Sequence, residues 1–132
     1  MFEFYISRLD IYGQGKKTAT VNFEQGLNII YGPSNTGKTY VLESIDFVLG
    51  RKADKPPFNP KLGYDKIALT LSSRSSENEY IRIEREIGKT KYHVNSNIED
   101  IETKTYSQSG KNAISNFYIS LLGISDEPKV FT

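Results

Sequence analysis

The chain has 132 residues and a formal net charge of +1, with no cysteine and a single histidine. This length fits one domain, and the balanced charge gives no bulk attraction to nucleic acid. Without cysteine there is no disulfide, zinc-thiolate site or cysteine nucleophile, and one histidine excludes a multi-histidine metal site. The sequence shows no signal peptide and no apolar run long enough to cross a bilayer, so we expect a soluble, cytoplasmic protein without a membrane partner.

The first part of the chain predicts a strand-rich start followed by a helix. Alternating β-branched and aromatic residues indicate strands at 4–12, 18–23 and 27–31. Apolar residues at helical spacing then predict a helix over 40–49, with Gly50 in the position of a C′ glycine.

The second part predicts an antiparallel meander rather than βαβ units. Its strands are expected at 66–71, 79–87 and 90–95. On the middle strand, isoleucines share one face, and Arg85 interrupts that face. His93 lies within the last strand, where we expect a surface or half-buried side chain and not a general base.

A second helix is predicted from about residue 111 to residue 122. Ile114, Phe117, Tyr118, Leu121 and Leu122 form its apolar face. Ser109 is its expected N-cap and Gly123 its stop, so helix capping also explains the Ser-Gln-Ser-Gly run around Gln108.

Between the predicted strand 27–31 and the predicted helix 40–49 lies a complete G-x-x-x-x-G-K-[ST] motif, in the context that a phosphate-binding loop requires. Gly32 and Gly37 allow the backbone to wrap around a phosphate, and successive N–H groups form an anion-binding concavity. Lys38 is expected to reach the β- and γ-phosphates, and the Thr39 hydroxyl to bind Mg²⁺. The predicted cofactors are ATP and Mg²⁺, with Lys38 as the catalytic residue, Thr39 as the metal ligand, and Gly32, Pro33, Ser34, Asn35, Thr36, Gly37, Lys38, Thr39 and Tyr40 as cofactor-binding residues.

Hydrolysis needs further groups that the sequence does not clearly supply. P-loop NTPases hold Mg²⁺ with a second carboxylate and orient the attacking water with another polar group. Asp126 and Glu127 follow an apolar run, but its period is helical up to Gly123, so we interpret them as part of a solvated loop. A GTPase is disfavoured, because the D-x-x-G at Asp10 precedes the phosphate loop. A stand-alone nucleotide-binding module or a small P-loop kinase is the alternative function.

The order and spacing of these segments resemble the N-terminal half of an ABC-type ATPase head from the SMC/RecF/RecN group of chromosome and DNA-repair proteins. The similarity is carried by residues 9–13, the Gly-Leu-Asn lead-in within 23–32, the loop 33–39 and the Val-Leu-Glu-Ser-Ile-Asp-Phe-Val-Leu-Gly helix at 41–50. It is loose over 51–125. The sequence departs from the family at Asp10, where a basic residue often lies near the nucleotide.

The resemblance implies an α/β fold of the P-loop NTPase class, half of an ABC/SMC-type head with a mixed sheet, an antiparallel β-meander and a P-loop helix. Residues 1–132 would form a single N-terminal lobe of a longer protein, because the family's Gln loop, coiled-coil arms, signature and Asp-Glu pair are absent. We therefore expect a missing C-terminal lobe, head-to-head dimerisation and little hydrolysis by this chain alone.

The resemblance also implies a role in DNA repair, chromosome maintenance or defence, with DNA as a partner. The long segment 51–63 is rich in lysine, proline and glycine, and loops of this length are often functional or mobile. Loops in this place in the family approach the γ-phosphate or DNA. We expect the same of Arg51, Lys52, Lys55 and Lys61, with a solvated connector as the alternative.

Overall fold

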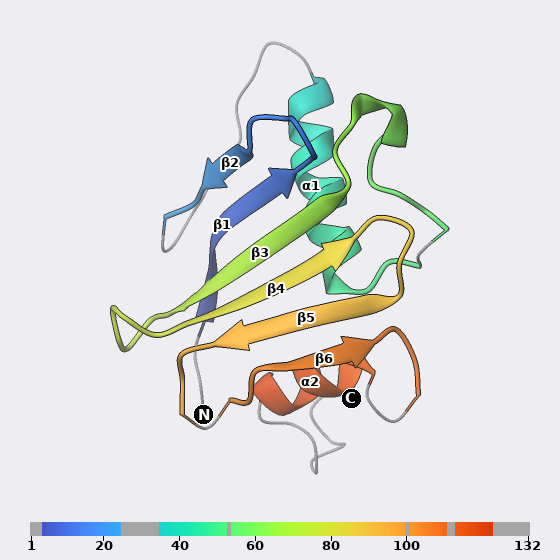
Figure 1. Ribbon diagram of the computed structural model, residues 1–132. Coiled ribbons are helices and arrows are strands. Elements are labelled where there is room, and N and C mark those ends of the chain that lie inside the picture. Colours follow the sequence, from blue (N-terminus) through green and yellow to red (C-terminus); the bar gives the residue numbers. More distant parts are fainter. Residues whose placement is uncertain (1–3, 25–34, 53, 100, 111–112, 123–132) are drawn as a thin grey trace.

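The computed structural model describes residues 4–24, 35–52, 54–99, 101–110 and 113–122, which form one sheet and two helices (Figure 1). The elements in chain order are β1 Phe4–Tyr12, β2 Ala19–Asn22, α1 Asn35–Leu49, the short 3-10 helix η1 Pro60–Leu62, β3 Lys66–Ser73, β4 Tyr80–Glu86, β5 Lys91–Ser96, β6 Lys104–Ser107 and α2 Ile114–Leu122.

The sheet has the strand order β2-β1-β3-β4-β5-β6, and each neighbouring pair is antiparallel. The register places Leu9 of β1 opposite Leu69 of β3, and Leu69 opposite Ile83 of β4. Because side chains alternate along a strand, this register gathers the apolar residues of neighbouring strands on one face.

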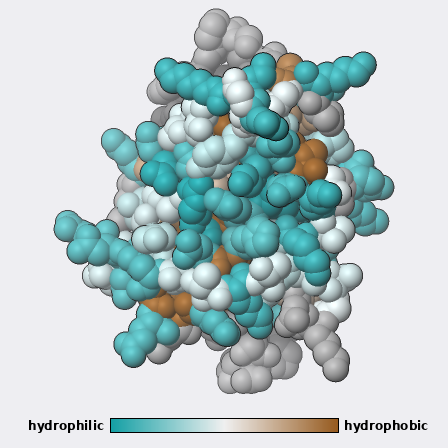
Figure 2. Space-filling model, viewed as in Figure 1, coloured by the Kyte–Doolittle hydropathy of each residue, from teal (hydrophilic) through white to brown (hydrophobic). Residues whose placement is uncertain are grey.

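Both helices lie on that apolar face. Phe47 and Val48 of α1 are fully buried there, and Ile114 and Phe117 of α2 are nearly so. The opposite face carries polar side chains, as antiparallel sheets allow. Figure 2 looks onto this outer face and shows a mostly hydrophilic surface with small apolar patches. The fold is therefore two-layered, with a core between the sheet and its helices.

A glycine ends α1. Gly50 has a φ of 135°, a backbone conformation that residues with a Cβ rarely adopt. The Gly50 N–H donates to the Phe47 carbonyl, and the Arg51 N–H donates to the Asp46 carbonyl, both at 3.3 Å. These two bonds form a Schellman motif, which confirms the predicted role of Gly50.

Most of the predicted strands are confirmed. β1 has the predicted bounds, and β2 to β5 lie within two residues of the predicted ones. The antiparallel meander is confirmed as well. In the part of the chain that the structure describes, every strand pair is antiparallel, so the parallel component of the predicted mixed sheet is not seen there. The strand predicted over 27–31 lies outside the described residues.

The predicted starts of both helices are wrong, and one strand was not predicted. α1 begins at Asn35 and not at Tyr40, because the helix includes the second half of the glycine-containing motif. β6 was not predicted, since Lys104–Ser107 is a four-residue strand without apolar alternation. α2 begins at Ile114, so Ser109 is not its N-cap. Gly110, with a φ of 92°, turns the chain between them.

A close backbone approach makes Gly13 a sensitive position. A Cβ added to Gly13 would lie 2.1 Å from the carbonyl oxygen of Gly63, in the segment before β3. Backbone atoms cannot swing aside as a flexible side chain does. The turn after β1 and the segment before β3 can therefore meet only through a glycine.

We predict that Gly13→Ala lowers the free energy of unfolding by about 1–3 kcal/mol, the usual cost of overpacking. Urea unfolding measures this change. The control is Gln14→Ala at the exposed neighbouring position, which should change stability by less than about 0.5 kcal/mol. Equal stabilities of the two variants would contradict the backbone clash.

Candidate nucleotide-binding site

The phosphate-loop motif lies at the N-terminal end of α1. Gly32, Pro33 and Ser34 are outside the described residues. Asn35–Thr39 form the first turn of α1, and the structure describes their backbone. The unpaired N–H groups and the positive dipole end of the helix therefore fall within the motif. α1 has no acidic residue in its first turn, so no carboxylate on that turn opposes an anion.

Tyr40 is the one predicted cofactor-binding residue whose side chain the structure describes. Its side chain is 36% exposed, and its ring lies 5.9 Å from the ring of Phe58, measured between centroids. Phe58 is buried and also contacts Tyr64, edge to face, at 6.4 Å. The segment 51–63 is thus anchored at Phe58 beside the motif end of α1, and is not free along its whole length.

Arg51 interacts with α1 itself. Its guanidinium forms ion pairs with Glu43 and Asp46, with an Nη2–Oδ2 distance of 2.8 Å to Asp46. The side chain is only 19% exposed. Arg51 is therefore held against α1 with its charge already paired, while its approach to nucleotide or DNA stays a prediction. The exposed cations of this segment are Lys52, Lys55 and Lys61.

Two further side chains, Arg85 of β4 and Gln108, donate hydrogen bonds to backbone carbonyls at and just after the C-terminal end of α1. Arg85 Nη1 donates to the carbonyl oxygens of Phe47 at 2.6 Å and Arg51 at 2.5 Å. Gln108 Nε2 donates to the same Arg51 carbonyl at 3.0 Å. Neither role is predicted from the sequence. The available signal for Arg85 was its place in the isoleucine face of its strand, where an exposed cation is not expected.

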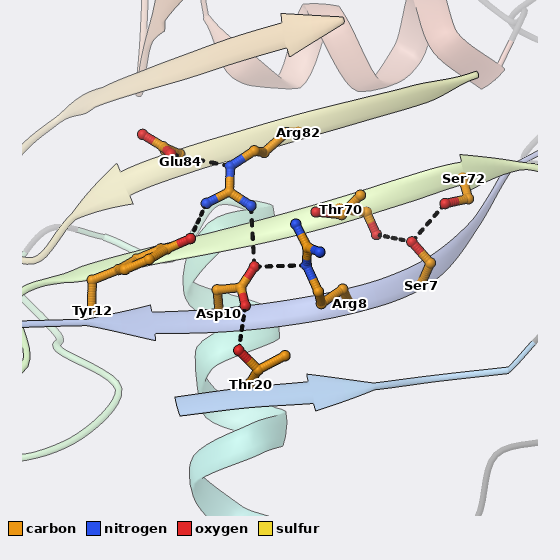
Figure 3. A network of polar contacts seen from close by, with 9 residues as sticks. All are labelled: Ser7, Arg8, Asp10, Tyr12, Thr20, Thr70, Ser72, Arg82 and Glu84. Atoms are coloured by element: carbon orange, nitrogen blue, oxygen red, sulfur yellow. Dashed lines mark hydrogen bonds and ion pairs between the residues drawn. The ribbon is translucent and has the colours of Figure 1, made fainter. Parts of the chain in front are cut away.

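Asp10 is the centre of a polar network on the outer face of the sheet (Figure 3). Its carboxylate is 5% exposed and accepts hydrogen bonds from Thr20 at 2.7 Å, Arg8 at 2.9 Å and Arg82 at 3.1 Å. Burial raises the pKa of Asp10, but the hydrogen bonds from Thr20 and Arg82 and the two positive charges outweigh it and lower the pKa. Asp10 is therefore a structural anchor in this fold.

Arg82 is the second centre of that network. It also donates to Glu84 at 3.1 Å and to the Tyr12 hydroxyl, and its guanidinium lies 5.5 Å from the centroid of the Tyr12 ring. A groove of about 640 Å³ crosses this face, with Arg8 and Arg82 among its lining residues. Because carboxylates pair with both cations, the groove does not offer the uncompensated positive charge that a phosphate would select.

The remaining candidate residues show no catalytic arrangement. His93 is exposed on β5, as predicted, and its Nδ1 lies 3.0 Å from the Thr105 hydroxyl. Asp126 and Glu127 lie outside the described residues. Within the described ranges, no group of three or more His, Cys, Asp or Glu side chains could hold a metal ion. No helix in those ranges is long and apolar enough to cross a membrane.

Comparisons with known proteins show the family of the chain. Residues 6–128 match the family described as AAA domain. The chain is also similar to the DNA repair protein RecN of Aquifex aeolicus (strain VF5), with 29% identity over 104 residues. That similarity covers 74% of this chain and 18% of the RecN protein. Together they confirm the resemblance to the N-terminal lobe of an SMC/RecF/RecN-like P-loop ATPase.

The Asp10 network predicts a pH-dependent contribution to stability. Asp10→Asn should lower the free energy of unfolding near neutral pH by about 2 kcal/mol, the scale of a hydrogen bond to a charged group. Because folding lowers the pKa of Asp10, its stabilisation is present above the ordinary value of about 3.9 and is lost as the pH falls through the folded-state value.

The difference between wild type and Asp10→Asn should therefore shrink in acid. Urea unfolding at about pH 7 and about pH 2.5 measures it, on either side of the ordinary carboxyl pKa. Asp54→Asn, at an exposed position, is the control and should leave stability nearly unchanged at both pH values. A deficit of Asp10→Asn that stays the same in acid would contradict the network.

Proposed function

Since the chain belongs to the AAA-domain family of ATPases, we propose that it binds Mg·ATP as the N-terminal lobe of an SMC-like ATPase head. The observation that supports this most is that α1 begins at Asn35, inside the G-x-x-x-x-G-K-[ST] motif. A helix that starts there directs its unpaired N–H groups and its positive dipole end toward the preceding loop. Phosphate groups bind well at such a position.

The motif residues then have separate roles that follow from their chemistry. The backbone of Gly32–Gly37 would bind the phosphates, with Pro33, Ser34, Asn35 and Thr36 contributing through their main chain. The Lys38 ammonium would offset the charge of the β- and γ-phosphates, and the Thr39 hydroxyl would bind Mg²⁺. When bound, Mg²⁺ neutralises charge on the phosphate oxygens. Tyr40, exposed at the next position, would border the nucleotide.

The lobe would form only part of a working ATPase. The chain spans 18% of the RecN protein that it resembles, which supports a further, C-terminal lobe and closure of two heads against each other. Most catalytic power in phosphoryl transfer comes from preorganised charge around the transferring group. We therefore propose that residues 1–132 bind nucleotide weakly and that hydrolysis depends on the second lobe.

A role in DNA repair, chromosome maintenance or defence, in the cytoplasm, completes the proposal. The named function of the RecN relative supports the first of these. DNA contact by the segment 51–63 would use its exposed lysines, because Arg51 is paired with two carboxylates of α1.

We predict different effects for Lys38→Ala and Thr39→Ala. Lys38→Ala should weaken nucleotide binding with or without Mg²⁺, because it removes a charge from the phosphates. Thr39→Ala should weaken mainly the Mg²⁺-dependent part. Calorimetric titrations of ATP with and without Mg²⁺ separate the two roles, and Thr18→Ala in the turn before β2 is the control. Equal losses for Thr39→Ala in both conditions would contradict its assignment as a metal ligand.

ATP turnover typical of a working ATPase, abolished by Lys38→Ala, would contradict the need for a second lobe.

For DNA contact, we predict that Lys52→Ala with Lys55→Ala lowers DNA affinity of the longer protein and flattens its salt dependence. Each lost phosphate contact should reduce the slope of log K against log salt by about 0.9. Arg74→Ala removes an exposed cation from the turn between β3 and β4 and serves as the control. An unchanged slope in the double variant would leave a solvated connector as the role of this segment.

A further inference from the structure

Arg85 is a fully buried cation on the apolar face of the sheet. Its side chain is 0% exposed, and it is the largest fully buried side chain of the described residues. Burial lowers the pKa of its guanidinium, although arginine stays protonated in proteins. No carboxylate within the described ranges forms an ion pair with it. The charge must therefore be compensated by other groups.

The compensation comes from backbone carbonyls, mainly at and just after the C-terminal end of α1, and from two aromatic rings. Arg85 Nε also donates to the Lys89 carbonyl at 3.4 Å. Arg85 Nη1 donates to the Phe47 carbonyl, at the negative end of the helix dipole, and to the Arg51 carbonyl two residues after the helix. Its guanidinium carbon lies 4.0 Å from the centroid of the Phe47 ring and 4.5 Å from that of Tyr92. Cation–π attraction is strongest when the cation is desolvated. One planar group thus joins α1 to β4 and β5.

The end of α1 has no other cation of this kind. The helix has no basic residue in its last turn. The Tyr118 hydroxyl donates to the Val48 carbonyl, but it is neutral, and the Arg51 guanidinium turns back to acidic side chains of the helix. Arg85 is therefore the group that connects the negative end of the helix dipole to the sheet.

Stability alone does not require an arginine here. Replacing a buried charge with an apolar side chain of similar size is often neutral or stabilising. The Phe47 carbonyl would keep the Gly50 N–H, and the Arg51 carbonyl would keep Gln108, so neither acceptor would be left unpaired. A guanidinium differs from an apolar side chain in its fixed planar geometry, which determines where its acceptors lie.

We propose that Arg85 is a positioning residue that fixes α1 on the sheet and thereby sets the nucleotide affinity of the motif at the other end of the helix. The effect on affinity rests on the proposed function, whereas the effect on the helix does not. α1 has 15 residues and is about 22 Å long, so it transmits a displacement of one end to the other as a rigid element.

The test compares Arg85→Met and Arg85→Lys with Val94→Ala in the full 132-residue chain. Val94 is buried on β5 and makes no described hydrogen bond to α1, so its truncation destabilises the core without removing a hydrogen bond to the helix. Amide hydrogen exchange of Gly50 and Arg51, whose N–H groups close the helix, is measured relative to global stability. Calorimetric titration with Mg·ATP gives the affinity of each folded variant.

Arg85→Met should speed exchange at Gly50 and Arg51 beyond the change in global stability, and should weaken Mg·ATP binding about fivefold or more, the low end of coupling between distant sites. Arg85→Lys should recover part of both, because an ammonium keeps the charge and its N–H donors but lacks the rigid plane of the guanidinium. Val94→Ala should show neither effect.

Exchange in Arg85→Met that only follows global stability would overturn the role of Arg85 in fixing the helix. If Arg85→Met speeds exchange at Gly50 and Arg51 beyond the change in global stability but leaves the affinity for Mg·ATP unchanged, the link to the nucleotide site is overturned. If the wild-type chain binds no Mg·ATP, the proposed function and the link to it fail, while the exchange comparison still decides whether Arg85 fixes α1. Should Arg85→Met not fold, Arg85→Lys carries both measurements.

Discussion

The C-terminal end of α1 is tied to the sheet by a buried guanidinium, which donates to the Phe47 carbonyl of the helix and to the Arg51 carbonyl just after it. Arg85 joins the negative end of the helix to β4, lies against Phe47 from the helix and Tyr92 from β5, and has no carboxylate partner among the described residues. Apolar burial is non-directional, whereas a hydrogen bond has a preferred direction. Hydrogen bonds to two carbonyls therefore restrict the end of the helix in a way that apolar packing alone does not.

Strand β4 carries two arginines with opposite environments, and together they determine where positive charge is available. Arg82, on the outer face, is compensated by Asp10 and Glu84, whereas Arg85, on the inner face, is compensated by carbonyls and rings. Both charges are thus used within the fold. The N-terminal end of α1 differs from both, because its first turn has no acidic residue and lies within the glycine-containing motif.

The predictions of helices and strands were correct where a local sequence pattern decides the structure, and wrong where contacts between distant segments decide it. Alternation in Lys66–Ser73 and Tyr80–Glu86 indicated strands, and both are present. β6 has no such alternation, and pairing with β5 makes it a strand. The same difference explains Asp10. Its place in the sequence marked a departure from a family that often has a basic residue near the nucleotide there. In the structure, its carboxylate is engaged by Arg8 of the same strand, Thr20 of β2 and Arg82 of β4.

By itself, the sequence determined the phosphate-loop motif, the helix after it, the meander and the family, because these depend on residues close together along the chain. Only the tertiary structure decided what Arg51, Arg85 and Gln108 do. Arg85 and the Phe47 carbonyl are 38 residues apart, and alternation along β4 indicates which face Arg85 occupies but not which acceptors lie there. Those acceptors exist only once α1 has packed on the sheet, since burial turns a carbonyl that water would satisfy into one that needs a partner from the protein.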